Sequence, residues 1–225
     1  MFKKMLLTLT MLLSCLGFAG FSQKAFSETI SIQNVHSFGG GTISAALNTY
    51  ADGHSGYYDI AYSKSESWSR SDNRGFIMAI KDNGTLRTYY SRPSVDYLYY
   101  DGKMYKKEDP SGQHLPLTIL KTTTDFTPTG SSQIKVNDYA GDVQVGISSW
   151  DGGQSGYYSL SRGDTEKWSR DYDARGYLLY IKFSGNSTTY VYYVSNSGVE
   201  IGVYGLNQLY INDSSRSPLQ PVYAY

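Results

Sequence analysis

The sequence predicts an all-β protein made of two tandem repeats, each an antiparallel β-sandwich or small barrel, with no significant helix after an N-terminal signal segment. Three observations lead to this fold class. One segment occurs twice with many identical residues, short apolar or alternating runs are separated by turn-forming residues, and the chain of 225 residues contains 23 tyrosines and 23 glycines. After the signal segment, no stretch has the periodicity of an amphipathic helix.

Residues 1–27 have the pattern of a bacterial secretory signal peptide. Two lysines precede an apolar run, and small residues near Ser27 suit cleavage. We therefore expect a secreted, extracellular protein. A lipoprotein-like sequence that ends at Cys15 gives a lipidated anchor there as the alternative. Because Cys15 is the one cysteine of the sequence, the exported part has no disulfide and no thiol chemistry.

The repeat is most evident in two segments. Residues 55–70 are SGYYDIAYSKSESWSR, and residues 155–170 are SGYYSLSRGDTEKWSR. The correspondence continues beyond them with one insertion. We therefore expect a first β repeat over residues 28–107, a linker over residues 108–132 and a second β repeat over residues 133–225.

Short strands and tight turns account for most of each repeat. In the first, an apolar strand over residues 76–81 leads through Asn83-Gly84 into a second strand, and residues 98–105 read as a hairpin. In the second, residues 188–194 alternate in the two-residue period of a strand. The aromatic tail over residues 222–225 is expected to pack as an edge segment.

The two repeats retain one set of aromatic and charged residues, which we call the twin motif. It consists of Tyr57, Tyr58, Glu66, Trp68, Arg70, Asp72 and Arg74 in the first repeat, and of Tyr157, Tyr158, Glu166, Trp168, Arg170, Asp173 and Arg175 in the second. Adjacent strand residues face opposite sides, so one tyrosine of each pair is expected to face the core and the other the surface.

The twin motif has two interpretations, and the sequence leaves both open. As a structural corner, the tryptophan caps the core and the arginines pair with the aspartates. As a ligand cleft, the indole stacks on a sugar ring or meets a quaternary ammonium group, while arginine and glutamate bind hydroxyls or phosphate. One set of residues can serve both roles.

The sequence offers little for catalysis. His36, His54 and His114 have no histidine counterpart in the other repeat and no metal-ligand spacing, and no Gly-x-Ser-x-Gly occurs. The acidic residues of the twin motif come with arginines that favour ionised carboxylates over a raised pKa. We therefore predict a non-enzyme with no catalytic residues, metal or cofactor. Calcium at Asp52 or Asp151 is the minor alternative to simple turns at these positions.

Composition favours recognition outside the cell. The formal net charge is zero, which argues against nucleic acid as a partner. A tyrosine-rich chain suits lectin-like binding of extracellular carbohydrate or cell-surface material, with the twin motif forming two ligand-binding sites. The alternatives are a membrane-active toxin or cytolysin that contacts lipid, and a secreted inhibitor or matrix protein that binds another protein. No oligomeric state is predicted.

Overall fold

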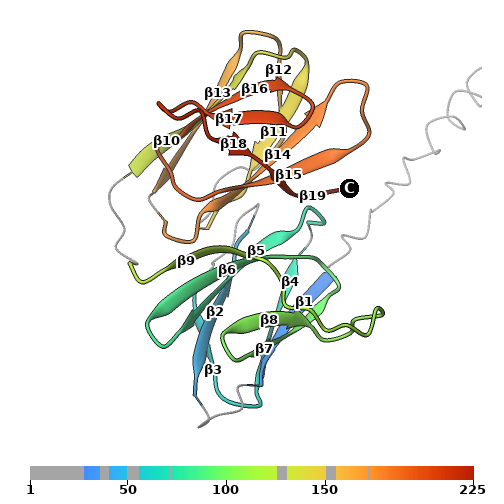
Figure 1. The fold of residues 1–225 in the computed structure, drawn as a ribbon, viewed down its shortest axis with the longest axis vertical. Helices are drawn as coiled ribbons and strands as arrows, with labels where there is room; N and C mark the ends of the chain where they lie inside the picture. The colour runs from blue at the N-terminus through green and yellow to red at the C-terminus, as the bar shows by residue number, and fades with distance from the viewer. Residues whose placement is uncertain are drawn as a thin grey trace, which may run out of the picture.

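The computed structural model describes residues 28–35, 41–49, 56–70, 72–125, 131–150, 156–171 and 173–225. Over these ranges the chain is all-β, without helix, and its strands form four sheets (Figure 1). This part of the predicted fold class is confirmed. The expected signal peptide and the alternative anchor at Cys15 lie outside the described residues.

Two sheets form the first half of the molecule, which we define as residues 28–125. One has the order β4-β1-β7-β8, with β1 (Glu28–Asn34), β4 (Ser65–Arg70), β7 (Asp96–Tyr100) and β8 (Lys103–Lys106). The other has the order β3-β2-β5-β6-β9, with β2 (Ile43–Leu47), β3 (Tyr58–Ile60), β5 (Phe76–Asp82), β6 (Thr85–Ser91) and β9 (Ile119–Thr123).

Two further sheets form the second half, residues 131–225. One has the order β13-β10-β16-β17-β18, with β10 (Ser131–Asp138), β13 (Thr165–Asp171), β16 (Glu200–Gly205), β17 (Gln208–Ile211) and β18 (Pro218–Leu219). The other has the order β12-β11-β14-β15-β19, with β11 (Val143–Ile147), β12 (Tyr158–Leu160), β14 (Tyr177–Phe183), β15 (Thr189–Val194) and β19 (Pro221–Ala224).

The strand orders of the two halves correspond. β4-β1-β7-β8 matches β13-β10-β16-β17, and β3-β2-β5-β6 matches β12-β11-β14-β15. Pairing is antiparallel as predicted, except that β1 pairs with β7 and β10 pairs with β16 in parallel. A parallel pair needs a long connection between its strands, and here five intervening strands supply it in each half. Local sequence patterns do not show such non-local pairs.

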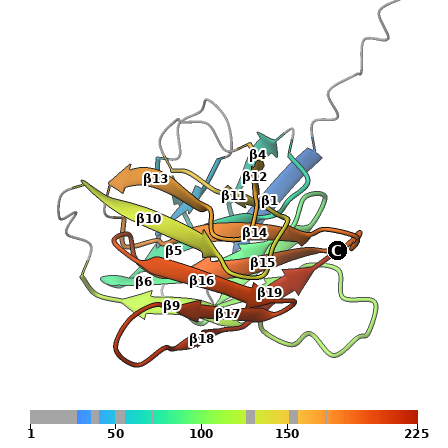
Figure 2. The ribbon, with the colours of Figure 1, turned by 90° about the horizontal axis from the view of Figure 1, so that it is seen from above.

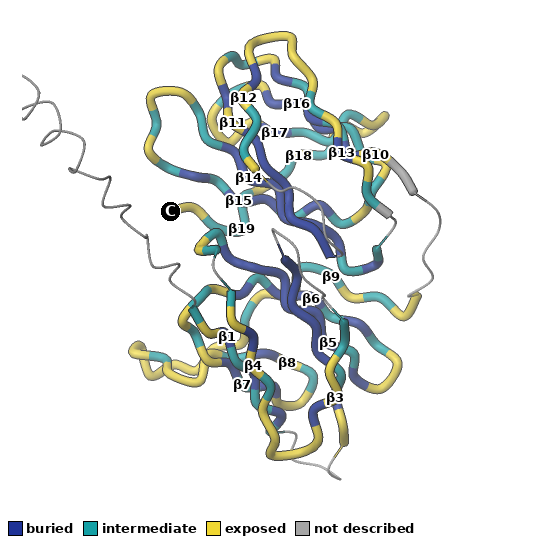
Figure 3. The backbone as a smooth tube through the Cα atoms, turned by 180° about the vertical axis from the view of Figure 1, so that it is seen from behind, coloured by how far each residue is buried: buried dark blue, intermediate teal, exposed yellow. Residues whose placement is uncertain are grey.

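The apolar runs of the sequence become central strands. β5 is buried along nearly its whole length, and so is β14 (Figure 3). A continuous apolar run suits a strand covered on both faces. The hairpin between β5 and β6 turns at Asn83 and Gly84, whose φ angles of 47° and 70° are the left-handed pair of a tight hairpin turn.

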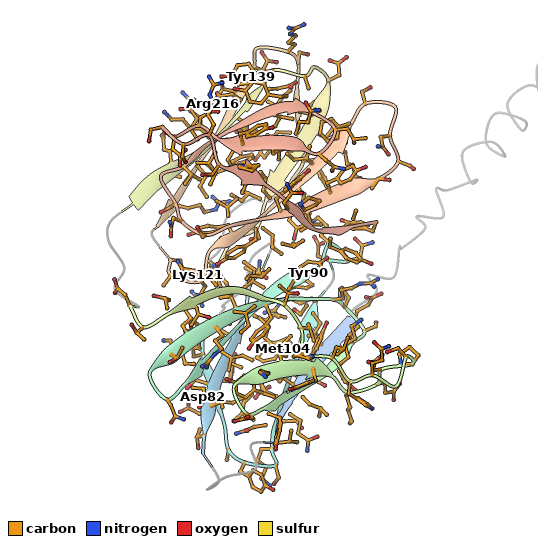
Figure 4. The ribbon with its side chains drawn as sticks, viewed as in Figure 1. Asp82, Tyr90, Met104, Lys121, Tyr139 and Arg216 are labelled. Atoms are coloured by element: carbon orange, nitrogen blue, oxygen red, sulfur yellow. The ribbon has the colours of Figure 1, made fainter. Side chains whose placement is uncertain are left out.

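The two halves are joined at equivalent positions. Thr49 and Ser149 form an antiparallel bridge, with N–H to carbonyl distances of 2.9 and 3.0 Å. Farther out, the Lys121 ammonium donates to the Ser195 carbonyl (3.0 Å), and the Tyr90 ring stacks on Tyr223 of β19 at 5.3 Å. Tyr90 and Lys121 lie at the boundary between the halves (Figure 4), and the view from above shows the second half covering the first (Figure 2).

The sheets β3-β2-β5-β6-β9 and β12-β11-β14-β15-β19, which we call the inner sheets, each end in an edge strand. The expected linker, residues 108–132, contains β9, which pairs antiparallel with β6. The aromatic tail forms β19, which pairs antiparallel with β15, and this confirms the expected edge segment.

Candidate functional site

The tryptophans of the twin motif lie in the cores of the two halves. Trp68 is 6 % exposed and Trp168 is 5 % exposed. Tyr58 meets the edge of Trp68 with ring centroids 6.1 Å apart, and Tyr158 meets Trp168 at 6.0 Å in the same T-shaped arrangement. Burial of the two indoles agrees with the structural-corner interpretation, in which the tryptophan caps the core.

The next arginine of each motif ties one sheet to the other. Arg70 Nε donates to the Asn48 carbonyl at 3.4 Å, and Arg170 Nε donates to the Ser148 carbonyl at the same distance. Burial lowers the pKa of both guanidinium groups. Glu66 precedes Arg70 on the same strand and is half-buried, and its carboxylate accepts a hydrogen bond from the backbone N–H of Ser67 (2.9 Å). Glu166 is half-buried at the equivalent position of the second half.

The second arginine of each motif forms an ion pair with the aspartate two residues earlier. Arg74 Nη2 lies 2.6 Å from Asp72 Oδ2, and Arg175 Nη2 lies 2.5 Å from Asp173 Oδ2. In both pairs the arginine Nε and its backbone N–H also donate to the carboxylate. The carboxylate thereby fixes the guanidinium plane.

These fixed guanidinium groups reach across the boundary between the halves. The Arg74 Cζ lies 5.5 Å from the centre of the Tyr157 ring, and the Arg175 Cζ lies 5.4 Å from the centre of the Tyr57 ring. Arg175 also lies over Trp150 of its own half, at 3.7 Å. An arginine of each half therefore contacts a tyrosine ring of the other half. Such paired contacts between equivalent residues are typical of an interface with two-fold symmetry.

The tyrosine pairs are oriented partly as expected. Tyr58 and Tyr158 meet the edges of the buried tryptophans, but Tyr58 is itself 43 % exposed. Tyr57 and Tyr157 face the other half, where a free surface was expected. Burial raises the pKa of Tyr57 well above its ordinary value. Tyr57, Tyr157 and the two aspartate–arginine pairs thus lie at the internal boundary, and the two tryptophans lie in the cores behind it.

One groove lies on the second half between β11, β12 and β14. Its volume is about 370 Å³, and its polar lining includes Asp142, Gln144, Ser159, Ser161, Lys182 and Asn186. Lys182 Nζ lies 4.8 Å from the centre of the Tyr157 ring, so part of the groove wall is held by the twin motif. Val143, Leu160 and Phe183 supply its apolar lining.

A cluster of tyrosines lies elsewhere, on the sheet β13-β10-β16-β17-β18. We call Tyr139, Tyr204 and Tyr210 the tyrosine platform. Tyr139 and Tyr204 are stacked with ring centroids 4.8 Å apart and planes 20° apart, and Tyr210 meets Tyr204 edge-on at 5.8 Å. Tyr139 is 41 % exposed and Tyr204 is 42 % exposed. Tyr139 lies at the end of the second half that is remote from the first half (Figure 4).

A row of polar side chains lies beside the platform. Asn137 Nδ2 donates to Glu200 Oε1 at 2.6 Å, and Asn212 Nδ2 lies 3.4 Å from the same oxygen. Thr165 Oγ1 donates to Asn137 Oδ1 at 2.6 Å. The strand register places Asn137 next to Gly202 and Gly202 next to Tyr210, so polar and aromatic groups share one face of the sheet.

The tyrosine platform was not predicted from the sequence. The predicted sites consist of residues that both repeats retain, whereas Tyr139 occupies a position that differs between the halves. A comparison of the repeats along β1 and β10 pairs Tyr139 with Val35, and that difference was the available signal.

Comparison with known proteins gives no further guide: no protein-family model matches the chain, and no curated protein matches it. In the described part of the chain, no three or more His, Cys, Asp or Glu side chains are grouped to hold a metal ion. The candidate calcium ligands Asp52 and Asp151 lie outside that part. No helix within the described ranges is long and apolar enough to cross a membrane.

Proposed function

We propose that the protein is an exported, non-enzymatic recognition protein that binds carbohydrate outside the producing cell. The tyrosine platform carries this proposal. Tyrosine offers a large, rigid and amphipathic contact surface that loses little conformational entropy on binding. A pyranose ring has C–H groups for an aromatic face and hydroxyls for neighbouring polar groups, and the platform has both kinds of partner on one sheet face.

The polar row supports the same ligand class. Glu200 accepts from two asparagines, so these three side chains are held in place before a ligand arrives. Preorganised donors and acceptors reduce the entropy lost on binding. The twin motif supports the platform indirectly, because it holds the second half against the first.

The test is a binding panel with the purified protein. Neutral polysaccharides, liposomes of zwitterionic and anionic lipid, and unrelated soluble proteins are compared by co-sedimentation and by calorimetry. We expect saturable binding to at least one polysaccharide and none to liposomes. Binding to liposomes alone, accompanied by dye release, would replace the proposal with the membrane-active alternative.

The Tyr204→Ala variant assigns that binding to the platform. The ring is 42 % exposed, so its removal should leave the fold intact while it removes the central aromatic face. Unchanged polysaccharide binding by a folded Tyr204→Ala protein would contradict the proposed site.

A further inference from the structure

The sheets that contain β1 and β10, which we call the outer sheets, can be compared residue by residue through their strand registers. Ile30 lies opposite Trp68, and Ile134 lies opposite Trp168, which makes these isoleucines equivalent. Counting along β1 and β10 then makes Gln33 equivalent to Asn137. These two residues lie next to Leu98 and Gly202, respectively, in the parallel pairs. Leu98 is therefore the first-half counterpart of Gly202.

Gly202 occupies the point on which the platform converges. A Cβ atom built on it would lie 2.7 Å from Tyr204 Cε2, 2.9 Å from Asn212 Oδ1 and 3.2 Å from Tyr139 Cε2. Both stacked rings and one amide of the polar row thus rest against its bare Cα. A side chain at this position would push the rings and the amide outward.

The first half lacks both features. Leu98 replaces Gly202 on the outward face of β7, where it alternates with the buried Tyr97 and Tyr99. Val35 replaces Tyr139, so Tyr100, the counterpart of Tyr204, has no equivalent ring to stack on. The first half therefore has a side chain at the position that a glycine leaves open beneath the rings of the second half.

We infer that Tyr139 and Gly202 are the residues that create the ligand-binding platform, and that the chain therefore binds one pyranose ligand, through its second half. This inference rests on the proposed function. It replaces two equivalent sites, one for each repeat, with a single site. The first half then serves as the partner against which the second half is held.

Calorimetry on the full chain tests the inference, with cellohexaose, mannohexaose, xylohexaose and chitohexaose as probes. For a probe that binds, we expect one ligand per chain. Tyr139→Val and Gly202→Ala should each lower the affinity about tenfold or more, as loss of a central aromatic contact does. The matched first-half variants Tyr100→Ala and Leu98→Ala should leave the affinity within about twofold. Thermal unfolding of each variant shows that it is folded.

The outcomes separate the inference from the proposed function. Two ligands per chain, or an equal loss of affinity in the first-half variants, would overturn the inference while carbohydrate binding stands. Unchanged affinity in the folded Tyr139→Val and Gly202→Ala proteins would also overturn the inference while carbohydrate binding stands. If the unaltered protein binds none of the probes and none of the polysaccharides in the panel, the proposed function falls and the inference falls with it.

Discussion

Two glycines in equivalent positions show how single residues shape this molecule. Gly75 and Gly176 have φ angles of 88° and 72°. The hydroxyl of Tyr90 lies 2.2 Å from the place of a Cβ on Gly75, and that of Tyr193 lies 2.5 Å from the corresponding place on Gly176. Each hydroxyl donates to the carbonyl of the preceding arginine at 3.1 Å. Each glycine therefore permits the close approach of a tyrosine ring as well as the positive φ angle of the backbone.

Replacement of Gly75 by alanine should therefore cost more than backbone strain. Gly84→Ala is the matched control, since its φ is 70° and nothing lies within 4 Å of its Cβ position. We expect the control to lose roughly 1–2 kcal/mol of unfolding free energy. Gly75→Ala should lose about 1–3 kcal/mol more, because Tyr90 is held by its hydrogen bond and by Tyr223. Urea unfolding measures both, and equal losses would contradict the contact.

The reciprocal arginine–tyrosine contacts make a second prediction at this scale. A double-mutant cycle of Arg74→Met and Tyr157→Leu should give a coupling energy of about 0.5–2 kcal/mol. The equivalent cycle of Arg175→Met and Tyr57→Leu should give a similar value, because the distances of 5.5 and 5.4 Å match. A coupling energy near zero in both cycles would show that the halves are not held together by these pairs.

At the scale of elements, local sequence predicted the hairpins well and the edges less well. The β5-β6 hairpin follows from an apolar run and an Asn-Gly turn. β9 (Ile119–Thr123) lies within residues 108–132, which were expected to be a linker because they have no counterpart inside a repeat. The parallel pairs β1-β7 and β10-β16 could not be predicted, because they join strands that many residues separate.

The C-terminal strand should stabilise more than its own sheet. Tyr223 stacks on Tyr90 of the first half at 5.3 Å, and the Arg92 Cζ lies 4.7 Å from the centre of its ring. We expect Tyr223→Ala to lower the unfolding free energy by roughly 1–3 kcal/mol. Tyr62→Ala, at a position 50 % exposed, is the control and should change it by less than about 0.5 kcal/mol. Thermal or urea unfolding measures both variants. Equal losses of unfolding free energy in Tyr223→Ala and Tyr62→Ala would contradict this role of the C-terminal strand.

At the scale of the whole molecule, buried tyrosines connect stability to alkaline pH. Burial raises the pKa of Tyr89, Tyr97 and Tyr192 from 10.0 to about 12. Between these values the unfolded chain releases protons that the folded chain keeps. The folded state thus binds more protons than the unfolded state, and its stability must fall as the pH rises.

We therefore expect the unfolding free energy to lose this contribution progressively between about pH 10 and pH 12, and to retain it below about pH 10. Urea unfolding at a series of pH values measures the loss. Tyrosinate absorbance provides the check, because the signal of these three tyrosines should appear near pH 12. Complete titration of all tyrosines near pH 10 in the folded protein would contradict the burial.

The candidate site could be predicted from the sequence only in part. The twin motif is conspicuous because the repeats share it. Part of it, namely Tyr57, Tyr157 and the two aspartate–arginine pairs, lies at the boundary between the halves. The platform depends on Tyr139 and Gly202, which differ from their counterparts Val35 and Leu98. Residues that both halves share are the ones that both need for packing, whereas the platform is a surface of the second half alone.

The most direct measurement is hydrogen exchange of the protein with and without a saturating polysaccharide. Binding at the platform predicts slower exchange in β10 and the residues after it, to about Ala140, and in residues 200–212, with the twin motif unchanged. Slower exchange confined to residues 56–76 and 156–177 would place the ligand at the twin motif instead. That result would contradict the central claim that recognition belongs to the tyrosine platform of the second half.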